Sequence, residues 1–440
     1  TGFGPTIKVA KQEALSDLSQ SIKAEVQSSF SNSKTQYGDA ISKTAKSNIV
    51  VSSNLPIIGA EFELFDNPES VEALVALSPK KAKTLYQTKL TQLHKEIKTL
   101  KQKIDTSKQS HIKVELLTRL LQNLNEFDRY YSVGIIIGLK DIALPRVSKA
   151  YVHSALLELQ NHIDSLQQAG RHLAKAFKDY DNIYLYPPKA DGSHEITPFA
   201  KALTLQIKPH IKNAPNLAKA KYQLIGHYIY NDKGLIVNYD LIDIKTHENK
   251  YSSTISLKPQ AYKDYRITSN TLNFDQLLHN GVVSSSSLKA SVVTNKGSDE
   301  LLFIEAEEVE LLIKLNKMGY YYLVGYTQTE AGKFAYLLEL NEAAGEQRFK
   351  GFINADDANR WMSLGIFNVE PPFGVESLQL ISSNREFKSL PEHYYDRESG
   401  YYMIGKSPKD GLQKTRGLIR KQSKKREISE AVLLFTTMQK

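Results

Sequence analysis

The spacing of apolar residues changes along the chain, and this change limits the fold more than any other property of the sequence. Between residues 80 and 131, apolar side chains recur at intervals of three and four, the period of helices that pack face to face. These side chains are Tyr86, Leu90, Leu93, Ile97, Leu100 and Ile104, then Leu117, Leu120, Leu124, Phe127 and Tyr131. A polar break at residues 105–110 separates the two groups. We therefore predict a projecting antiparallel helical pair through which the chain associates with another subunit.

Shorter patterns flank this pair. Apolar residues recur at every fourth position over residues 5–30, which predicts an amphipathic helix. Two runs with strand composition follow, at residues 48–64 and 71–77. Beyond the pair, residues 147–180 carry another helical pattern.

Most of the remaining chain is predicted to form strands, and apolar and polar residues alternate over residues 307–315. Strands are predicted over residues 183–186, 222–230, 235–244, 251–257, 307–315, 320–326, 334–340, 365–370, 376–382 and 431–436. Short helices are predicted over residues 199–211, 274–278 and 355–364. The whole pattern predicts an α+β protein of three small domains. They are residues 1–180 with the long helical hairpin, residues 181–283, and the β-rich residues 288–440.

The sequence lacks the patterns of common catalytic and cofactor sites. It has no cysteine, which excludes disulfides, thiol catalysis and cysteine-containing zinc sites. Its 11 histidines lack the spacing that places two of them on one helix face. Neither a phosphate-binding Gly-Lys-Ser/Thr loop nor a Gly-x-Ser-x-Gly nucleophile turn is present. We predict no catalytic residue, no cofactor and no metal, and hence a protein that is not an enzyme.

Two acidic clusters have explanations other than chemistry. Glu308 and Glu310 alternate with apolar neighbours, as on the solvent-facing side of a strand. Asp356 and Asp357 stand where the predicted helix 355–364 begins, and carboxylates there interact favourably with the helix dipole.

Basic residues are concentrated near the C-terminus. The formal net charge is +9, and residues 406–426 hold nine basic residues against Asp410 alone. The proline and glycines of this segment disfavour one continuous helix, so we predict a surface arm or loop that meets anionic lipid, a cell-wall polymer or an acidic protein. A solvated loop without a partner is the alternative. The candidate contact residues are Arg420, Lys421, Lys424, Lys425 and Arg426.

Tyrosine is strongly preferred over tryptophan, with 24 residues against one. Tyr394 and Tyr395, together with Tyr401 and Tyr402, bracket a short polar stretch that is typical of a loop or hairpin. Exposed tyrosines there could anchor a partner protein or stack on a sugar, because a phenol combines an apolar ring with a polar tip. Packing inside the domain is the alternative for these four residues.

Both ends of the chain resemble proteins of the bacterial envelope. Gly2-Phe3-Gly4, the Ala-rich helix after it and the strand at residues 72–77 resemble the small outer-membrane lipoprotein family and the N-terminal domain of FlgT-type flagellar ring proteins. Residues 241–246 resemble a strand of FlgT-type proteins and of CsgG-type secretion-pore lipoproteins. Pro371-Pro372-Phe373-Gly374 with Glu376, together with residues 319–322, 415–417 and 435–437, resembles a bacterial domain of unknown function.

These resemblances imply a non-enzymatic scaffold or assembly factor of the bacterial cell envelope, possible partners being the flagellar motor or a secretion system. They imply a periplasmic, outer-membrane-associated or secreted protein whose partners are other envelope proteins. Two other functions stay open. One is nucleic-acid binding through residues 406–426, which the near-neutral charge of the rest of the chain disfavours. The other is glycan binding or glycan hydrolysis.

Overall fold

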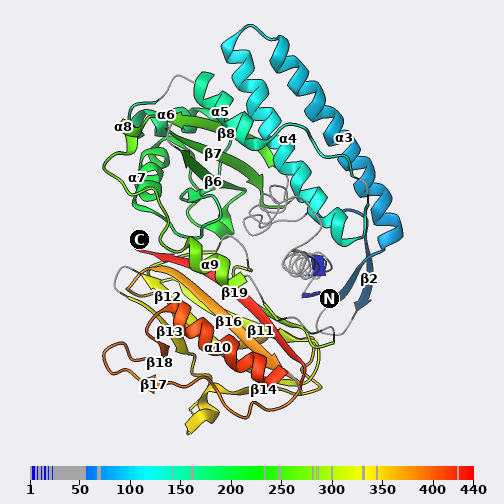
Figure 1. The fold of residues 1–440 in the computed structure, drawn as a ribbon, viewed down its shortest axis with the longest axis vertical. Coiled ribbons are helices and arrows are strands. Elements are labelled where there is room, and N and C mark those ends of the chain that lie inside the picture. The colour runs from blue at the N-terminus through cyan, green and yellow to red at the C-terminus, as the bar shows by residue number, and fades with distance from the viewer. Residues whose placement is uncertain are drawn as a thin grey trace. The chain divides into compact units, whose positions relative to one another are not determined.

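A computed structural model shows the chain as two compact units, Thr1–Ser269 and Asn270–Lys440 (Figure 1). It describes residues 2–4, 7, 11, 14, 15, 18, 22, 56–66, 71–140, 142–159, 163–231, 234–245, 249–279, 282, 283, 285, 287–298, 301–329, 332–342, 345–423 and 426–440. Most of the helix predicted over residues 5–30, and residues 48–55 of the next predicted strand, lie outside the described residues.

The first unit starts with a small antiparallel sheet and three helices. The sheet has the order β1-β3-β2, with β1 (Gly2–Gly4), β2 (Ala60–Asp66) and β3 (Val71–Leu77). The helices are α3 (Pro79–Thr106), α4 (Ser110–Ile136) and α5 (Lys149–Leu159).

The long helices α3 and α4 form the predicted antiparallel pair and run side by side (Figure 1). Lys89 pairs with Glu126 across 2.9 Å, and Asn123 donates to Glu96 across 3.1 Å. Later positions of α3 thus meet earlier positions of α4, as antiparallel helices require. Helix α5 adds Val152 to the same core, so the apolar seam is shared by three helices rather than two.

A second, mixed sheet completes the first unit. Its order is β4-β6-β7-β8, with β5 also paired to β6. The strands are β4 (Ile183–Leu185), β5 (Lys189–Ala190), β6 (Tyr222–Asn231), β7 (Gly234–Asp243) and β8 (Asn249–Leu257). The helices are α6 (Leu166–Ala176), α7 (Pro198–Ile207) and α8 (Pro259–Tyr262), with short 3-10 turns at Lys208–His210 and Leu217–Lys219. Helices α6 and α7 share a core with one face of this sheet.

The helix predicted over residues 147–180 is interrupted, which corrects that prediction. Between α5 and α6, the backbone of Ile163 accepts from Lys258 and donates to Ser256, both across 3.2 Å. The chain at Ile163 thus pairs with β8, and a residue that pairs with a strand cannot continue a helix.

The second unit is built from two sheets with a shared core. The larger sheet has the order β10-β19-β16-β12-β13-β18-β17, with β14 also paired to β12, and the smaller one has the order β15-β11-β9. The strands are β9 (Ala290–Thr294), β10 (Leu302–Ile304), β11 (Glu308–Leu315), β12 (Gly319–Thr329), β13 (Lys333–Leu337), β14 (Gly351–Ile353), β15 (Met362–Asn368), β16 (Gly374–Ser383), β17 (Tyr394–Tyr395), β18 (Tyr402–Gly405) and β19 (Ile428–Met438). Leu311 and Ile313 of the smaller sheet pack against Leu323 and Leu380 of the larger one.

Two helices cover the opposite face of the larger sheet, α9 (Leu272–His279) and α10 (Pro408–Gln422). Phe274, Leu412 and Ile419 from these helices share a core with Tyr322 and other residues of the strands. A 3-10 turn, Gly345–Phe349, lies between β13 and β14. The predicted α+β class, with a helical hairpin in the first part and a β-rich last part, is confirmed.

One further detail of the sequence-based description differs from the structure. Residues 355–364 are not a helix: the Asn354 side chain accepts from the Asp357 backbone N–H as a helix cap would, but Asn359 has φ +64° and β15 begins at Met362. The division into three domains stays a prediction. Residues 1–269 form one compact unit, and α9 belongs to the second.

Candidate functional site

The predicted tyrosines lie at one edge of the larger sheet, where β17 is the terminal strand. Tyr394, Tyr395 and Tyr401 are 57%, 53% and 43% exposed, whereas Tyr402 is partly buried. We call these four residues the tyrosine edge. The structure brings all four predicted residues together, because β17 and β18 pair antiparallel with Tyr395 opposite Tyr402.

The tyrosine edge is divided between the two faces of the sheet. On the face covered by α10, the rings of Tyr395 and Tyr402 are 5.0 Å apart, and the Arg348 guanidinium lies 5.4 Å from the Tyr402 ring. On the other face, the Tyr401 ring is 4.5 Å from Tyr336 and 5.7 Å from Phe334. Successive side chains of a strand point to opposite faces, so Tyr401 and Tyr402 separate in this way. Ring packing thus positions Tyr395 on one face and Tyr401 on the other.

A carboxyl group shares the face of Tyr401. Glu376 on β16 is directly opposite Thr327 on β12, and Thr327 is directly opposite Phe334 on β13. The Thr327 hydroxyl donates to Glu376 Oε2 across 2.9 Å, and Thr327 also hydrogen-bonds Tyr336. Residues that are directly opposite on neighbouring strands lie on the same face of a sheet. We call Thr327, Phe334, Tyr336, Glu376 and Tyr401 the Glu376 cluster.

The surroundings of Glu376 change its ionisation. Burial among these side chains raises the pKa of the Glu376 carboxyl to about 8, although the Thr327 hydrogen bond acts in the opposite direction. Sequence reasoning used Glu376 only as part of a motif and missed the cluster. Its members come from three strands and a turn, and no local pattern in the sequence joins them.

The basic segment is not the predicted arm or loop, because residues 408–422 form helix α10. The Ser407 side chain caps the helix by accepting from the Asp410 backbone N–H across 3.2 Å. Gly411 lies against β13, where an added Cβ would be 2.2 Å from Cβ of Ala335. Burial of Leu412 and Ile419 at helical spacing then outweighs the weak helix propensity of glycine.

The predicted basic contact residues have different surroundings. Arg420 and Lys421 are exposed in the last turn of α10. Arg426 donates to the carbonyl of Glu386 across 2.7 Å. Lys424 and Lys425 lie outside the described residues. Of the described basic residues proposed as contacts, Arg420 and Lys421 are therefore the most accessible.

Beneath α10, a polar network crosses the core of the second unit. The Tyr326 hydroxyl donates to Gln379 across 2.6 Å, and the Gln379 amide donates to Glu430 across 2.8 Å. Burial raises the pKa of the Glu430 carboxyl and lowers that of the Arg416 guanidinium. The Arg416 side chain donates to the carbonyls at the end of α9. These contacts fasten both helices to the sheet, which assigns the network a structural role.

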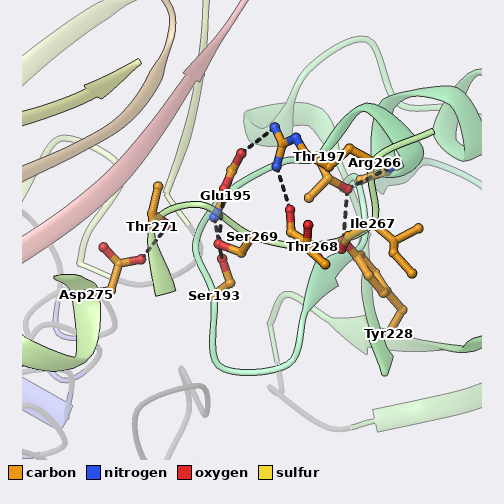
Figure 2. A network of polar contacts seen from close by, with 11 residues as sticks. Ser193, Glu195, Thr197, Tyr228, Arg266, Ile267, Thr268, Ser269, Thr271 and Asp275 are labelled. Carbon is orange, nitrogen blue, oxygen red and sulfur yellow. Dashed lines mark hydrogen bonds and ion pairs between the residues drawn. The ribbon is translucent and has the colours of Figure 1, made fainter. Parts of the chain in front are cut away.

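A second network of polar contacts lies near the C-terminal end of the first unit (Figure 2). Arg266 donates to Glu195 across 2.8 Å, and Ser269 donates to the same carboxylate across 3.1 Å. Thr197 and Tyr228 share a hydrogen bond of 2.8 Å, and the Tyr228 hydroxyl contacts the carbonyl of Ile267. These bonds tie the start of α7 and strand β6 to the segment that leaves α8, so the network stabilises the fold.

The candidates for metal binding and proton transfer have other partners. Glu307, which precedes the predicted surface residues Glu308 and Glu310, pairs with Lys296 across 2.6 Å. Burial, followed by the Lys149 charge, lowers the pKa of His153 to about 4, which keeps its imidazole neutral at physiological pH. Within the described parts of the chain, no three His, Asp or Glu residues are grouped so that they could hold a metal ion. No described helix is long and apolar enough to cross a membrane.

Comparisons with known proteins provide no relative from which a site could be transferred. No family model matches the chain. No curated protein and no solved structure matches it either.

Proposed function

We propose that this protein is a non-enzymatic scaffold or assembly factor of the bacterial cell envelope, and that it binds another envelope protein through the tyrosine edge. The single observation that carries the binding role is the exposure of Tyr394, Tyr395 and Tyr401 on one short hairpin. Tyrosine is enriched among the residues that dominate protein interfaces. Ring contacts to Tyr336 and Tyr402 hold Tyr401 and Tyr395 before binding, which lowers the entropy lost on association.

The envelope location is supported by the sequence resemblances at the two ends of the chain. The same resemblances support association with the flagellar motor or with a secretion system. Helix α10 supplies a second surface, since exposed Arg420 and Lys421 lie close together in its last turn. We assign this surface to anionic lipid or a cell-wall polymer, because basic side chains attract negatively charged surfaces.

Self-association through α3 and α4 is also part of the proposal. Lys, Gln and Thr cover the outer positions of α3, and such a polar face suits a hydrated contact between subunits. Helix α5 fills part of the apolar seam within one chain, so the contact uses the outer faces rather than the seam.

Cell fractionation followed by size-exclusion chromatography tests the proposal. We expect the protein in the envelope fraction, in a complex larger than one chain, and we expect Tyr394→Ala with Tyr395→Ala to release it. Tyr230→Ala with Tyr265→Ala is the matched control, because these tyrosines are 45% and 40% exposed on the first unit. A mainly cytosolic pool would contradict the location. A complex that survives the Tyr394 and Tyr395 changes would contradict the binding role.

A further inference from the structure

We infer that the partner of the tyrosine edge inserts a basic side chain, an arginine or a lysine, against Glu376 and the aromatic rings of the Glu376 cluster. This inference rests on the proposed function, since it identifies the chemistry of the partner at the same edge of the sheet. Tyr401 belongs both to the tyrosine edge and to the Glu376 cluster, so one ligand segment can contact both.

The backbone of the sheet creates the room for this arrangement. The ring of Tyr336 lies on Gly325 of the neighbouring strand, where an added Cβ would be 2.2 Å from its Cζ atom. The absence of a side chain at Gly325 lets the phenol lie flat and hydrogen-bond Thr327. Thr327 is only 5% exposed, whereas Tyr401 is 43% exposed. The cluster therefore has a buried hydroxyl base and an accessible aromatic rim.

When Glu376 ionises, no ion pair among the described residues of the second unit neutralises its charge. Among the described residues, the hydrogen-bond partner of the Glu376 carboxylate is Thr327, and no ion pair involves Glu376. Burial, followed by the charge of Glu376, raises the pKa of the Tyr336 and Tyr401 phenols, so these two rings are electrostatic neighbours of the carboxyl. A cation placed there would gain both the carboxylate charge and the faces of the aromatic rings.

Two basic groups of the second unit, Arg348 and Lys296, have acidic partners of their own. Arg348 lies against Tyr402 and pairs with Glu339 across 3.1 Å, on the α10 side of the sheet. Lys296, which lies over the ring of Phe303, pairs with Glu307. Helix α10 packs on the opposite face through Leu412, so its basic surface does not face Glu376. No ion pair among the described residues supplies a cation to Glu376, so we assign the complementary cation to a partner.

An arginine fits the site better than a neutral side chain of the same shape. Its guanidinium can donate to the Glu376 oxygens while its plane stacks on a phenol ring. Binding a cation also favours the ionised carboxylate, so affinity should rise with pH through the pKa of about 8.

Peptide titration of the full chain tests the inference. The probes are acetyl-Gly-Arg-Gly-amide and the same peptide with neutral citrulline in place of arginine. Isothermal calorimetry or NMR measures the binding of each peptide. We expect the arginine peptide to bind at least about 10-fold more tightly than the citrulline peptide at pH 8.5. Its affinity should fall by roughly 25-fold at pH 6.5, since the ionised fraction of a carboxyl with a pKa of about 8 falls from roughly three quarters to about 3% between these pH values. Equal binding of the two peptides, or binding of neither, would overturn the inference.

Two variants separate recognition from folding. Glu376→Gln keeps the shape of the side chain and should abolish the preference for the arginine peptide. Glu398→Gln, at an exposed position near the same hairpin, should retain this preference. A preference that persists in Glu376→Gln would contradict the inference. A glucosamine oligosaccharide is the third probe, and tighter binding of this polymer than of the arginine peptide would show that the cation is not a protein side chain.

The same variants distinguish this inference from the proposed function. If Tyr394→Ala with Tyr395→Ala dissociates the envelope complex while Glu376→Gln leaves the affinity for the envelope partner unchanged, the binding role of the tyrosine edge stands and the inference fails. If neither change affects the complex but Glu376→Gln still abolishes the arginine preference, the proposed function fails and the cation site stands.

Discussion

The ring of Tyr336 rests on the backbone of Gly325, with no space for a side chain between the two strands. An added methyl group would lie 2.2 Å from Cζ of Tyr336 and 2.6 Å from its hydroxyl oxygen. This contact sets the position of the phenol within the Glu376 cluster. It also links a glycine of β12 to the chemistry proposed for the face of the sheet.

The first prediction concerns this contact. Gly325→Ala should force Tyr336 away from the sheet and destabilise the second unit by about 1–3 kcal/mol, as overpacking of a buried site does. Gly417→Ala is the control, because no atom lies within 4 Å of its added Cβ and alanine favours a helix. Urea denaturation measures both changes. Equal stability of Gly325→Ala and the parent would show that the ring moves at no cost.

The second prediction concerns the dependence of stability on pH. The pKa of Glu376 is about 8 in the folded protein and about 4.5 in the unfolded chain, so the folded state binds more protons between these values. Stability should therefore fall as pH rises from about 5 to 8, by up to about 1.4 kcal/mol per pH unit from this group. The free energy of unfolding of Glu376→Gln, measured in the same buffers, should lack this part of the slope. Parallel pH profiles for the variant and the parent would contradict the prediction.

The third prediction concerns the helical pair. Leu93 and Leu100 are 1% and 7% exposed in the core shared by α3, α4 and α5. Replacing both with Asp should unfold these helices, because an unpaired buried charge is strongly unfavourable. It should also dissociate any assembly that they mediate.

Circular dichroism and light scattering check this result. Leu205→Asp serves as the control, since Leu205 is 66% exposed. Unchanged helicity and unchanged mass in the double variant would refute the role of these two leucines.

The fourth prediction concerns the basic end of α10. Arg420→Gln with Lys421→Gln should change the free energy of unfolding by less than about 1 kcal/mol, because exposed charges contribute little to stability. Binding to vesicles that contain anionic lipid should nevertheless weaken, most strongly at low ionic strength, where screening is least. Sedimentation of vesicles with the protein measures this effect.

Removal of two exposed lysines from the first unit provides the matched control. Lys212→Gln with Lys219→Gln carries the same loss of charge away from α10. If both double variants lose the same amount of binding, net charge rather than the α10 surface attracts the membrane. The assignment of this surface would then be wrong.

The sequence by itself determined the elements whose stabilising contacts repeat along the chain. The three-and-four spacing from Tyr86 to Tyr131 predicted α3 and α4, because each apolar residue of a helix seam meets similar neighbours at a fixed distance in sequence. Alternation in the same way predicted β11, where Val309, Leu311 and Ile313 are buried. The tyrosine edge also followed from local sequence, since the pairs at residues 394–395 and 401–402 are joined by one short turn.

Only the tertiary structure decided the features that depend on distant partners. Helix α10 forms despite its glycines because Gly411 packs closely on Ala335, more than 70 residues earlier in the chain. Asn354 has the hydrogen bond of a helix cap, yet β11 pairs with β15 and draws the following residues into a strand. The ionisation of Glu376 likewise depends on its burial in the folded sheet and on the hydroxyl of Thr327, which comes from β12. Long-range pairing and burial set these outcomes, and neither has a local pattern in the sequence.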